Sequence, residues 1–143
     1  MLKIADKVLK NKPLESSEVV DGFVDNIVFG NKIEDLSKYV HEDVLINSVS
    51  GVRGQGYEAH KKALSVWNCA FKNRVSESLC SMEKADEFIH HWSVKALHVK
   101  PFHGMEASGQ EVHFKGVTLY KVRDGKIASI SGYSDFGRDS IYK

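Results

Sequence analysis

The sequence has few cysteines and little net charge. Its two cysteines, Cys69 and Cys80, form neither a CxxC motif nor a disulfide framework, so we expect a reducing compartment. The formal charge of +1 at pH 7 gives no reason to expect nucleic acid or a membrane surface as a partner. No run of about 18 apolar residues is available to span a bilayer. The N-terminal stretch MLKIADKVLKNK lacks the apolar core of a secretory signal, and we therefore expect a cytoplasmic protein.

Common catalytic and metal-binding motifs are also missing. There is no G-x-S-x-G nucleophile elbow, and the stretch GVRGQG lacks the context of a phosphate-binding loop. His90 and His91 are adjacent, so in a strand they would point to opposite faces. No paired cysteine or carboxylate spacing completes a zinc site around His98 and His103. We therefore expect no metal site.

Apolar residues in the first half recur at helical spacing. With 143 residues, of which 42% are hydrophobic, the chain is long enough for one domain with a substantial core. Pro13 separates a polar leader, residues 1–13, from a domain that we assign to residues 14–143. Steps of three and four between apolar residues predict three helices, over residues 20–28, 33–40 and 57–71.

After Asn73 the apolar period changes to two, which predicts strands. Strands are expected over residues 43–47, 75–82, 86–99 and 111–122, with a last strand after the Asp124-Gly125 hairpin turn. Helices followed by strands indicate the α+β class. We expect three N-terminal helices packed on one face of a curved antiparallel sheet, enclosing a cone lined by apolar strand faces.

Several short motifs occur in a characteristic order. Asn47 ends the first strand, LHVKPFHG contains His98, and DGKIASISGYSD ends on Asp135. In this order and spacing, residues 14–136 resemble the SnoaL-like polyketide cyclases, or ester cyclases, of the nuclear transport factor 2-like (NTF2-like) superfamily. The resemblance implies an NTF2-like cone and places Asp135 at the family's acidic position.

The resemblance also implies a reaction. Such cyclases close a ring by intramolecular aldol condensation, in which one carboxyl removes a proton alpha to a carbonyl and later returns it, without metal or organic cofactor. Asp135 is then the catalytic acid/base, and His98 orients it or binds a substrate oxygen. This role requires Asp135 to face a closed apolar cavity, where burial would raise the pKa of its carboxyl. The expected substrate is a small, mostly apolar, carbonyl-bearing molecule.

Further polar and aromatic residues are candidates for binding that substrate. Asn47 could donate its amide to a carbonyl that gains negative charge, as in an oxyanion hole. Trp92 offers flat apolar contact area on the same strand face as His90 and His98. The predicted substrate-binding residues are Asn47, Trp67, His90, Trp92, Thr118 and Tyr133.

Two other functions remain open. The same fold serves non-catalytic ligand-binding or scaffold modules, and fold alone does not assign function. It also serves other cofactor-free proton-transfer enzymes, such as isomerases and dehydratases. The isomerase alternative is disfavoured because Asn47 and Thr118 stand where those enzymes keep acids. In each case the uncovered sheet face, with Ile89, His91, Val117 and Leu119, predicts a homodimer.

Overall fold

The computed structural model describes residues 16–137 of the chain. The predicted leader, residues 1–13, lies outside the described residues, so its boundary stays a prediction. The helical elements are α2 (Ser16–Phe23), the π-helix η1 (Val24–Phe29), the 3-10 helix η2 (Ile33–Asp35), α3 (Leu36–Tyr39) and α4 (Tyr57–Ala70). The strands are β1 (Val40–Asn47), β2 (Arg53–Gln55), β3 (Phe71–Lys84), β4 (Glu87–His98), β5 (Glu111–Arg123) and β6 (Lys126–Ser134).

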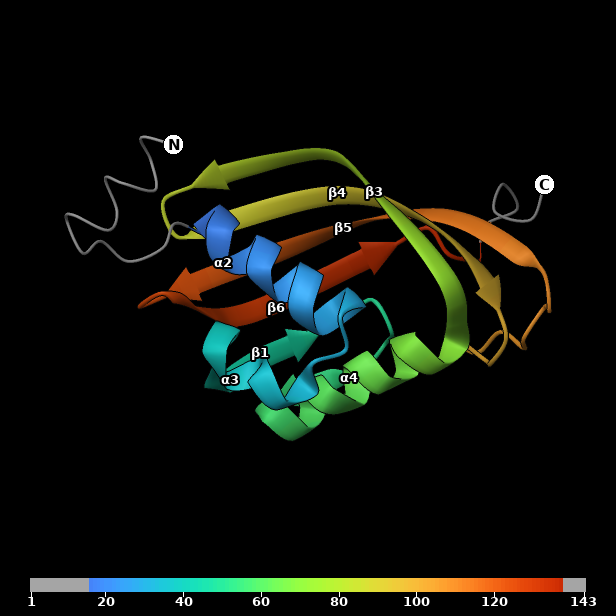
Figure 1. Cartoon of the computed structure of the whole chain (residues 1–143), viewed down its shortest axis with the longest axis horizontal. Coiled ribbons are helices and arrows are strands. Elements are labelled where there is room, and N and C mark those ends of the chain that lie inside the picture. The colour runs from blue at the N-terminus through green and yellow to red at the C-terminus, as the bar shows by residue number, and fades with distance from the viewer. Residues whose placement is uncertain (1–15, 138–143) are drawn as a thin grey trace.

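The α+β class is confirmed, with helices concentrated in the first half and long strands in the second (Figure 1). The predicted helices at 20–28 and 57–71 correspond to α2 with η1 and to α4. Between them, the prediction of a helix over 33–40 corresponds only to the short η2 and the four-residue α3, and Val40 already begins β1. The expectation of three N-terminal helices is therefore not confirmed as a set of three full-length helices.

Six strands form one sheet in the order β2-β1-β6-β5-β4-β3. Four of its pairings are antiparallel, but β1 pairs with β6 in parallel. The prediction of an antiparallel sheet is wrong at this pairing. The apolar pattern of β1 sets which of its side chains face inward, but it does not set the direction of a neighbour about 80 residues further along the chain.

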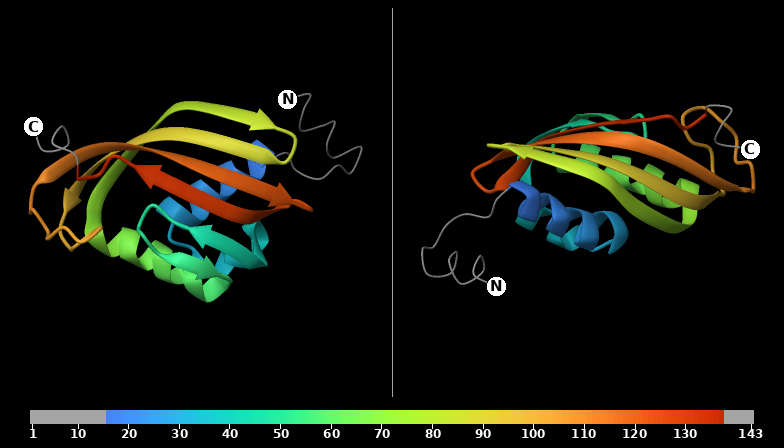
Figure 2. Two further views of the ribbon diagram at one scale, coloured as in Figure 1. Left: turned by 180° about the vertical axis from the view of Figure 1, so that it is seen from behind. Right: turned by 90° about the horizontal axis from the view of Figure 1, so that it is seen from above.

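The long strands arch over the helices, which lie on the concave side of the sheet (Figure 2). The predicted two-residue period holds along β5, where Val112, Phe114, Gly116, Thr118 and Tyr120 are all buried. Hairpin β5–β6 turns at Asp124 and Gly125, whose φ angles are 51° and 78°, as the turn signal predicts.

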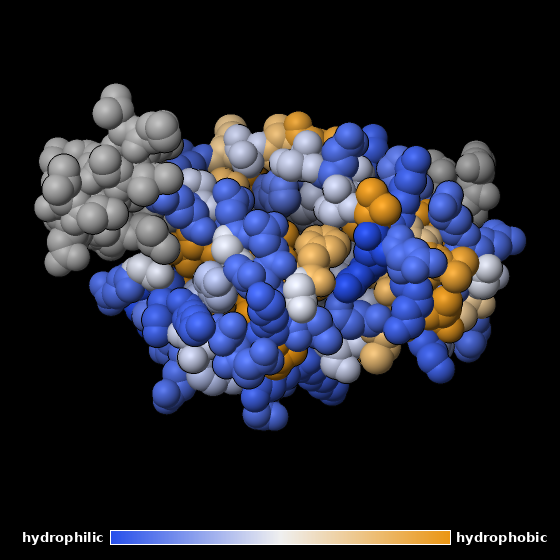
Figure 3. Space-filling view, in the orientation of Figure 1, coloured by the Kyte–Doolittle hydropathy of each residue, from blue (hydrophilic) through white to orange (hydrophobic). Residues whose placement is uncertain are grey.

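The space between helices and sheet contains two groups of buried apolar side chains. One packs α2 and α3 against β1 and the turn end of the β5–β6 hairpin, around Phe23, Val40 and Ile127. The other surrounds Trp67, Phe71 and Phe114 at the opposite end of the sheet. The helical face of the molecule is mainly hydrophilic, with small separate hydrophobic areas (Figure 3). No helix within residues 16–137 has both the length and the apolar character needed to cross a bilayer.

Candidate functional site

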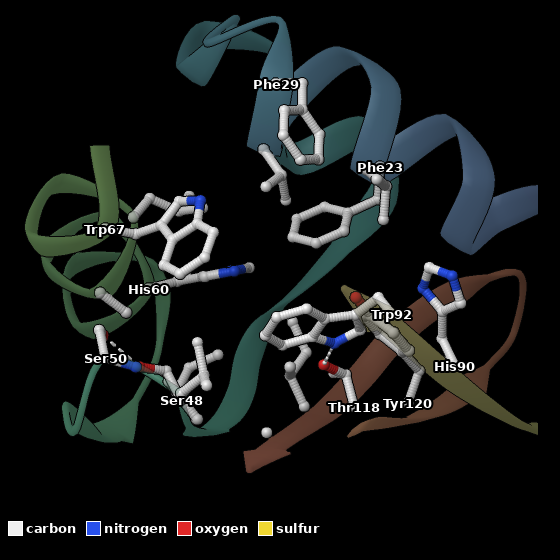
Figure 4. Close-up of a pocket in the computed structure, with 18 of the residues that line it drawn as sticks. Phe23, Phe29, Ser48, Ser50, His60, Trp67, His90, Trp92, Thr118 and Tyr120 are labelled. Atoms are coloured by element: carbon white, nitrogen blue, oxygen red, sulfur yellow. Dashed lines mark hydrogen bonds between the residues drawn. The ribbon is translucent and has the colours of Figure 1, made fainter. Parts of the chain in front are cut away.

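A cavity of about 120 Å³ lies between the helices and the concave face of the sheet. We call it the central cavity. Its lining comes from every layer of the fold: α2 and η1, the β1–β2 loop, α4, and strands β3 to β6 (Figure 4). For scale, an engineered apolar protein cavity of about 150 Å³ binds benzene. The central cavity is therefore comparable in size to one small ring.

Much of the apolar lining comes from the first helical segment. Phe23, Val24, Val28 and Phe29 all line the central cavity, and the last three belong to η1. A π-helix has a wider turn than an α-helix, so its side chains leave the axis at altered angles, and such segments recur at functional sites.

His60 on α4 is the most deeply buried titratable group in the cavity wall on the helical side. Its side chain extends toward the centre of the cavity, and the residue is 3% exposed (Figure 4). Phe23 packs on the imidazole with ring centroids 5.3 Å apart, and Nδ1 has no hydrogen-bond partner in the part of the chain that the structure describes. Burial lowers the pKa of His60 to about 4, because the charged imidazolium would lose its water. At neutral pH His60 is a neutral imidazole with an unused polar atom.

His90 on β4 lies on the other side of the cavity (Figure 4). Its Nε2 is 3.0 Å from Oγ of Ser78 on the neighbouring strand β3. Burial lowers the pKa of His90, and the negative charge of Asp21 on α2 opposes this shift. Burial in turn raises the pKa of Asp21. His90 is thus a neutral imidazole within the electrostatic influence of a carboxylate.

Between the two histidines, the floor of the cavity carries a buried polar network. Nε1 of Trp92 donates a hydrogen bond to Oγ1 of Thr118 at 2.9 Å. Burial raises the pKa of the Tyr120 hydroxyl, and a hydrogen bond with Thr118 opposes the shift. The Thr118 hydroxyl is therefore hydrogen-bonded to two aromatic neighbours on the sheet, so it has less capacity left to bind a ligand.

The loop after β1 closes a further side of the cavity. Ser48 and Ser50 line it, and their hydroxyls hydrogen-bond to each other. The Ser48 hydroxyl also accepts the backbone N–H of Ser50 at 3.0 Å. His103, from the loop between β4 and β5, bonds the carbonyl oxygen of Val49. These bonds fix the loop, so both hydroxyls are held near the cavity.

Four of the eight predicted site residues line the central cavity, and four do not. Those in its wall are Trp67, His90, Trp92 and Thr118. Asn47 and Tyr133 lie together elsewhere, with Nδ2 of Asn47 3.4 Å from the Tyr133 hydroxyl and Tyr133 61% exposed. The remaining two, Asp135 and His98, lie near an aromatic cluster beyond the cavity. Which of the eight act on a ligand stays a prediction.

The aromatic cluster consists of Phe71, Phe102, Phe114 and Phe136, packed around His98. Phe71 and Phe136 lie 5.3 and 5.2 Å from His98 between ring centroids. His98 is fully buried, burial lowers its pKa, and its Nδ1 accepts the backbone N–H of Ser108 at 3.4 Å. The protein's own side chains therefore fill the end of the cone next to the predicted catalytic pair.

Asp135 is held at the surface side of this end. Its Oδ1 accepts the backbone N–H of Lys115 at 2.8 Å, and its own N–H donates to the Lys115 carbonyl at 3.0 Å. Both bonds extend the pairing of β5 with β6 beyond its last register pair. Asp135 is not among the residues that line the central cavity. A catalytic role for Asp135 would require this segment to move.

Sequence patterns did not mark His60, Tyr120, Ser48 or Ser50 as site residues, although all four line the cavity. The helical spacing does place His60 on the same face of α4 as Leu64 and Trp67, and a polar residue on such a face is the signal that was available. Within residues 16–137, no three His, Cys, Asp or Glu side chains are grouped closely enough to hold a metal ion.

Comparisons with known proteins agree on the fold. The family model described as SnoaL-like polyketide cyclase matches residues 18–137. A SnoaL-like polyketide cyclase from Agrobacterium tumefaciens strain C58 is 15% identical, with a TM-score of 0.75 over 86% of this chain and 93% of that one. TsrD from Streptomyces laurentii is 17% identical, with a TM-score of 0.70 over 83% and 87% of the two chains. Among curated proteins, the sequence search found no significant match.

Proposed function

Because the chain belongs to the SnoaL-like polyketide cyclase family, we propose that it binds a small, mostly apolar carbonyl compound in the central cavity and closes a ring in it by intramolecular aldol reaction. The observation that carries this proposal is the apolar cavity of about 120 Å³ with two neutral histidines in its wall. A neutral imidazole can donate or accept a hydrogen bond without the cost of burying a charge. The pairing of two such groups with apolar walls suits a substrate that has carbonyl groups and no charge in the cavity.

The two histidines suit different steps. With a pKa of about 4, His60 is a weak base, so its better role is to hydrogen-bond the carbonyl that is attacked. The negative charge of Asp21 raises the pKa of His90 against the effect of burial. His90 is therefore the better base to remove a proton from the carbon alpha to the other carbonyl. The proton that His90 takes returns to the new alkoxide, so the reaction needs no cofactor and leaves the protein unchanged.

The family resemblance gives the acid/base role to Asp135 instead. For this assignment the Asp135 carboxylate would have to leave its hydrogen bond with the Lys115 N–H and move past the aromatic cluster into the central cavity. Asp135 is the competing candidate for the base, since substrate binding could rearrange the turn after β6. Both versions use the same cavity and the same substrate class. We also propose a cytoplasmic location, which the two free cysteines, Cys69 and Cys80, support.

A non-catalytic ligand-binding module is the second candidate. It is favoured by one observation: no carboxylate is among the described residues that line the cavity. A carboxyl base is the group that the family's reaction is expected to use, so a cavity lined without one also fits simple ligand storage or transport.

Turnover of 2,6-heptanedione tests these assignments. Its aldol closure and loss of water give 3-methylcyclohex-2-enone, whose conjugated carbonyl is followed by ultraviolet absorbance. We expect His90→Gln to lower turnover by roughly 10²–10⁴-fold, the usual contribution of a general base. Asp135→Asn keeps Oδ1 as an acceptor for the Lys115 N–H, so it tests the competing assignment without disturbing the fold. The exposed His113→Gln is the matched control.

The outcomes separate the candidates. Loss of turnover in Asp135→Asn, with His90→Gln active, assigns the acid/base role to Asp135. Binding of the dione without turnover supports the non-catalytic module. Absence of both binding and turnover argues against a small carbonyl ligand.

A further inference from the structure

A second pocket lies on the surface where α4 ends and β3 begins. Phe29, Asn31, Asn68, Lys72 and Arg74 are among its lining residues, and we call it the surface pocket. Within residues 16–137, its lining contains two cationic side chains and no acidic one. It lies next to the central cavity, because Phe29 lines both.

The Arg74 guanidinium is held in a defined position. Its Cζ lies 5.4 Å from the ring centroid of Phe29 and 5.9 Å from that of Trp67, so it stacks on two aromatic side chains. Nη1 donates a hydrogen bond to Oδ1 of Asn68. Nδ2 of Asn68 in turn donates to Oδ1 of Asn31 at 3.2 Å, which fixes the orientation of the Asn68 amide. The guanidinium is therefore pre-organised before any ligand arrives.

Among the described residues, no carboxylate pairs with this half-buried positive charge. Within residues 16–137, no ion pair joins Arg74 to a carboxylate, and desolvation is the only cause of the lowered pKa of its guanidinium. Asn68 occupies one N–H of a side chain that has five. Leaving a partly desolvated charge unpaired costs free energy that an anion could recover. A planar carboxylate matches the guanidinium fork in two hydrogen bonds.

The position of Arg74 links the charge to the cavity. The two rings on which it stacks, Phe29 and Trp67, are both part of the central cavity wall. The central cavity and the surface pocket share Phe29, so a ligand long enough to extend past this ring from the cavity would meet the guanidinium. We propose that the natural ligand is an amphipathic carboxylic acid, its apolar part held in the central cavity and its carboxylate bound by Arg74. This inference rests on the proposed function for the cavity and adds the charged end of the ligand.

Phenylalkanoates of increasing chain length test the inference, since one phenyl ring suits a cavity of this size. The probes are phenylacetate, 3-phenylpropanoate and 4-phenylbutanoate, each paired with its neutral amide. Kd is measured by calorimetry at low and at high salt. Because a hydrogen bond to a charged group is stronger than one to a neutral group, we expect the best carboxylate to bind roughly 10–100-fold more tightly than its amide, a difference of about 1.4–2.8 kcal/mol.

Arg74→Gln is expected to remove this preference by weakening the binding of the acid far more than that of the amide. Arg74→Lys, which keeps the charge but loses the fork, should retain part of it. Lys72→Gln removes a neighbouring exposed charge and is the control that should keep most of the preference. Urea unfolding of each variant checks that the fold is still stable when the Arg74 guanidinium no longer stacks on Trp67.

Equal binding of acid and amide by the wild-type protein would overturn the inference alone, as would a preference that survives Arg74→Gln. If neither the acids nor the amides bind, the cavity does not hold a small apolar ligand, and the proposed function fails with it. Tighter binding of the acids that is lost in Lys72→Gln but kept in Arg74→Gln would assign the anion to Lys72 and contradict the role of Arg74.

Discussion

The indole of Trp92 lies over Gly116, its cross-strand partner on β5, so closely that a Cβ at position 116 would be 2.2 Å from Cζ2 of the ring. Only glycine leaves room for this arrangement. It lets the indole lie flat on the sheet, where Nε1 reaches Thr118, and keeps the space above it open as the central cavity.

Gly116→Ala should therefore push Trp92 into the cavity. We expect a loss of roughly 1–3 kcal/mol in the free energy of unfolding, the usual cost of overpacking a core, and weaker binding of any cavity ligand. Urea unfolding and ligand titration measure the two effects. Lys121→Ala, an exposed position on the same strand, is the control. Wild-type stability and affinity in Gly116→Ala would show that Trp92 is not constrained as described.

Thr118→Val should leave the indole N–H of Trp92 in the core without a hydrogen-bond acceptor. Valine has the shape of threonine but no acceptor, and a buried unpaired donor costs about 1–3 kcal/mol. Thr118→Ser keeps the hydroxyl and should be closer to the wild type. In a double-mutant cycle measured by urea unfolding, Thr118→Val should cost much less when Trp92 is already phenylalanine. Equal costs in both backgrounds would mean that the hydrogen bond contributes nothing.

His60 should make the fold less stable in mild acid. Its pKa is about 4 in the folded protein and near 6.5 when exposed, so the unfolded chain binds a proton first as pH falls. The stability it contributes is complete above pH 6.5 and is lost progressively down to about pH 4. Between pH 7.5 and 5.0 the loss from this residue is about 2 kcal/mol, from 1.36 kcal/mol per pH unit.

His60→Leu removes this proton uptake, so its unfolding free energy should change less between the two pH values than that of the wild type. His90 and His98, whose pKa values burial also lowers, contribute in the same direction and remain in both proteins. Identical pH dependence of wild type and His60→Leu would contradict a buried neutral His60.

A homodimer through the outer sheet face stays a prediction, and the exposure of that face supports testing it. Across β4 and β5, Ile89 pairs with Leu119 and Val117 pairs with His91. Ile89 and Val117 are 36% and 39% exposed and lie on the face away from the helices. Val117→Glu should produce monomers at micromolar concentration in sedimentation velocity, because a buried charge would oppose association. Lys62→Glu on α4 is the control. A monomeric wild-type protein would refute the prediction.

The sequence predicted local structure well because that structure depends on local patterns. The period of two along β4 and β5 identified which residues face the concave side, including Trp92 and Thr118, and the Asp124-Gly125 turn followed from its residue types. It did not predict the parallel pairing of β1 with β6, because strand direction depends on how distant segments meet. It also gave no indication of the π-helix, which widens one turn without changing the apolar spacing.

The composition of the site was decided by tertiary packing. From sequence, Asp135 was the natural acid for the cavity, and His60 was one polar residue on an apolar helix face. In the folded chain, four phenylalanines fill the end of the cone near Asp135. The Oδ1 atom of Asp135 accepts a hydrogen bond from the Lys115 N–H. His60, in contrast, extends from α4 into the open part of the cone. A strand period states which face a side chain occupies, but whether that face borders empty space depends on the volumes of side chains brought together from the whole chain.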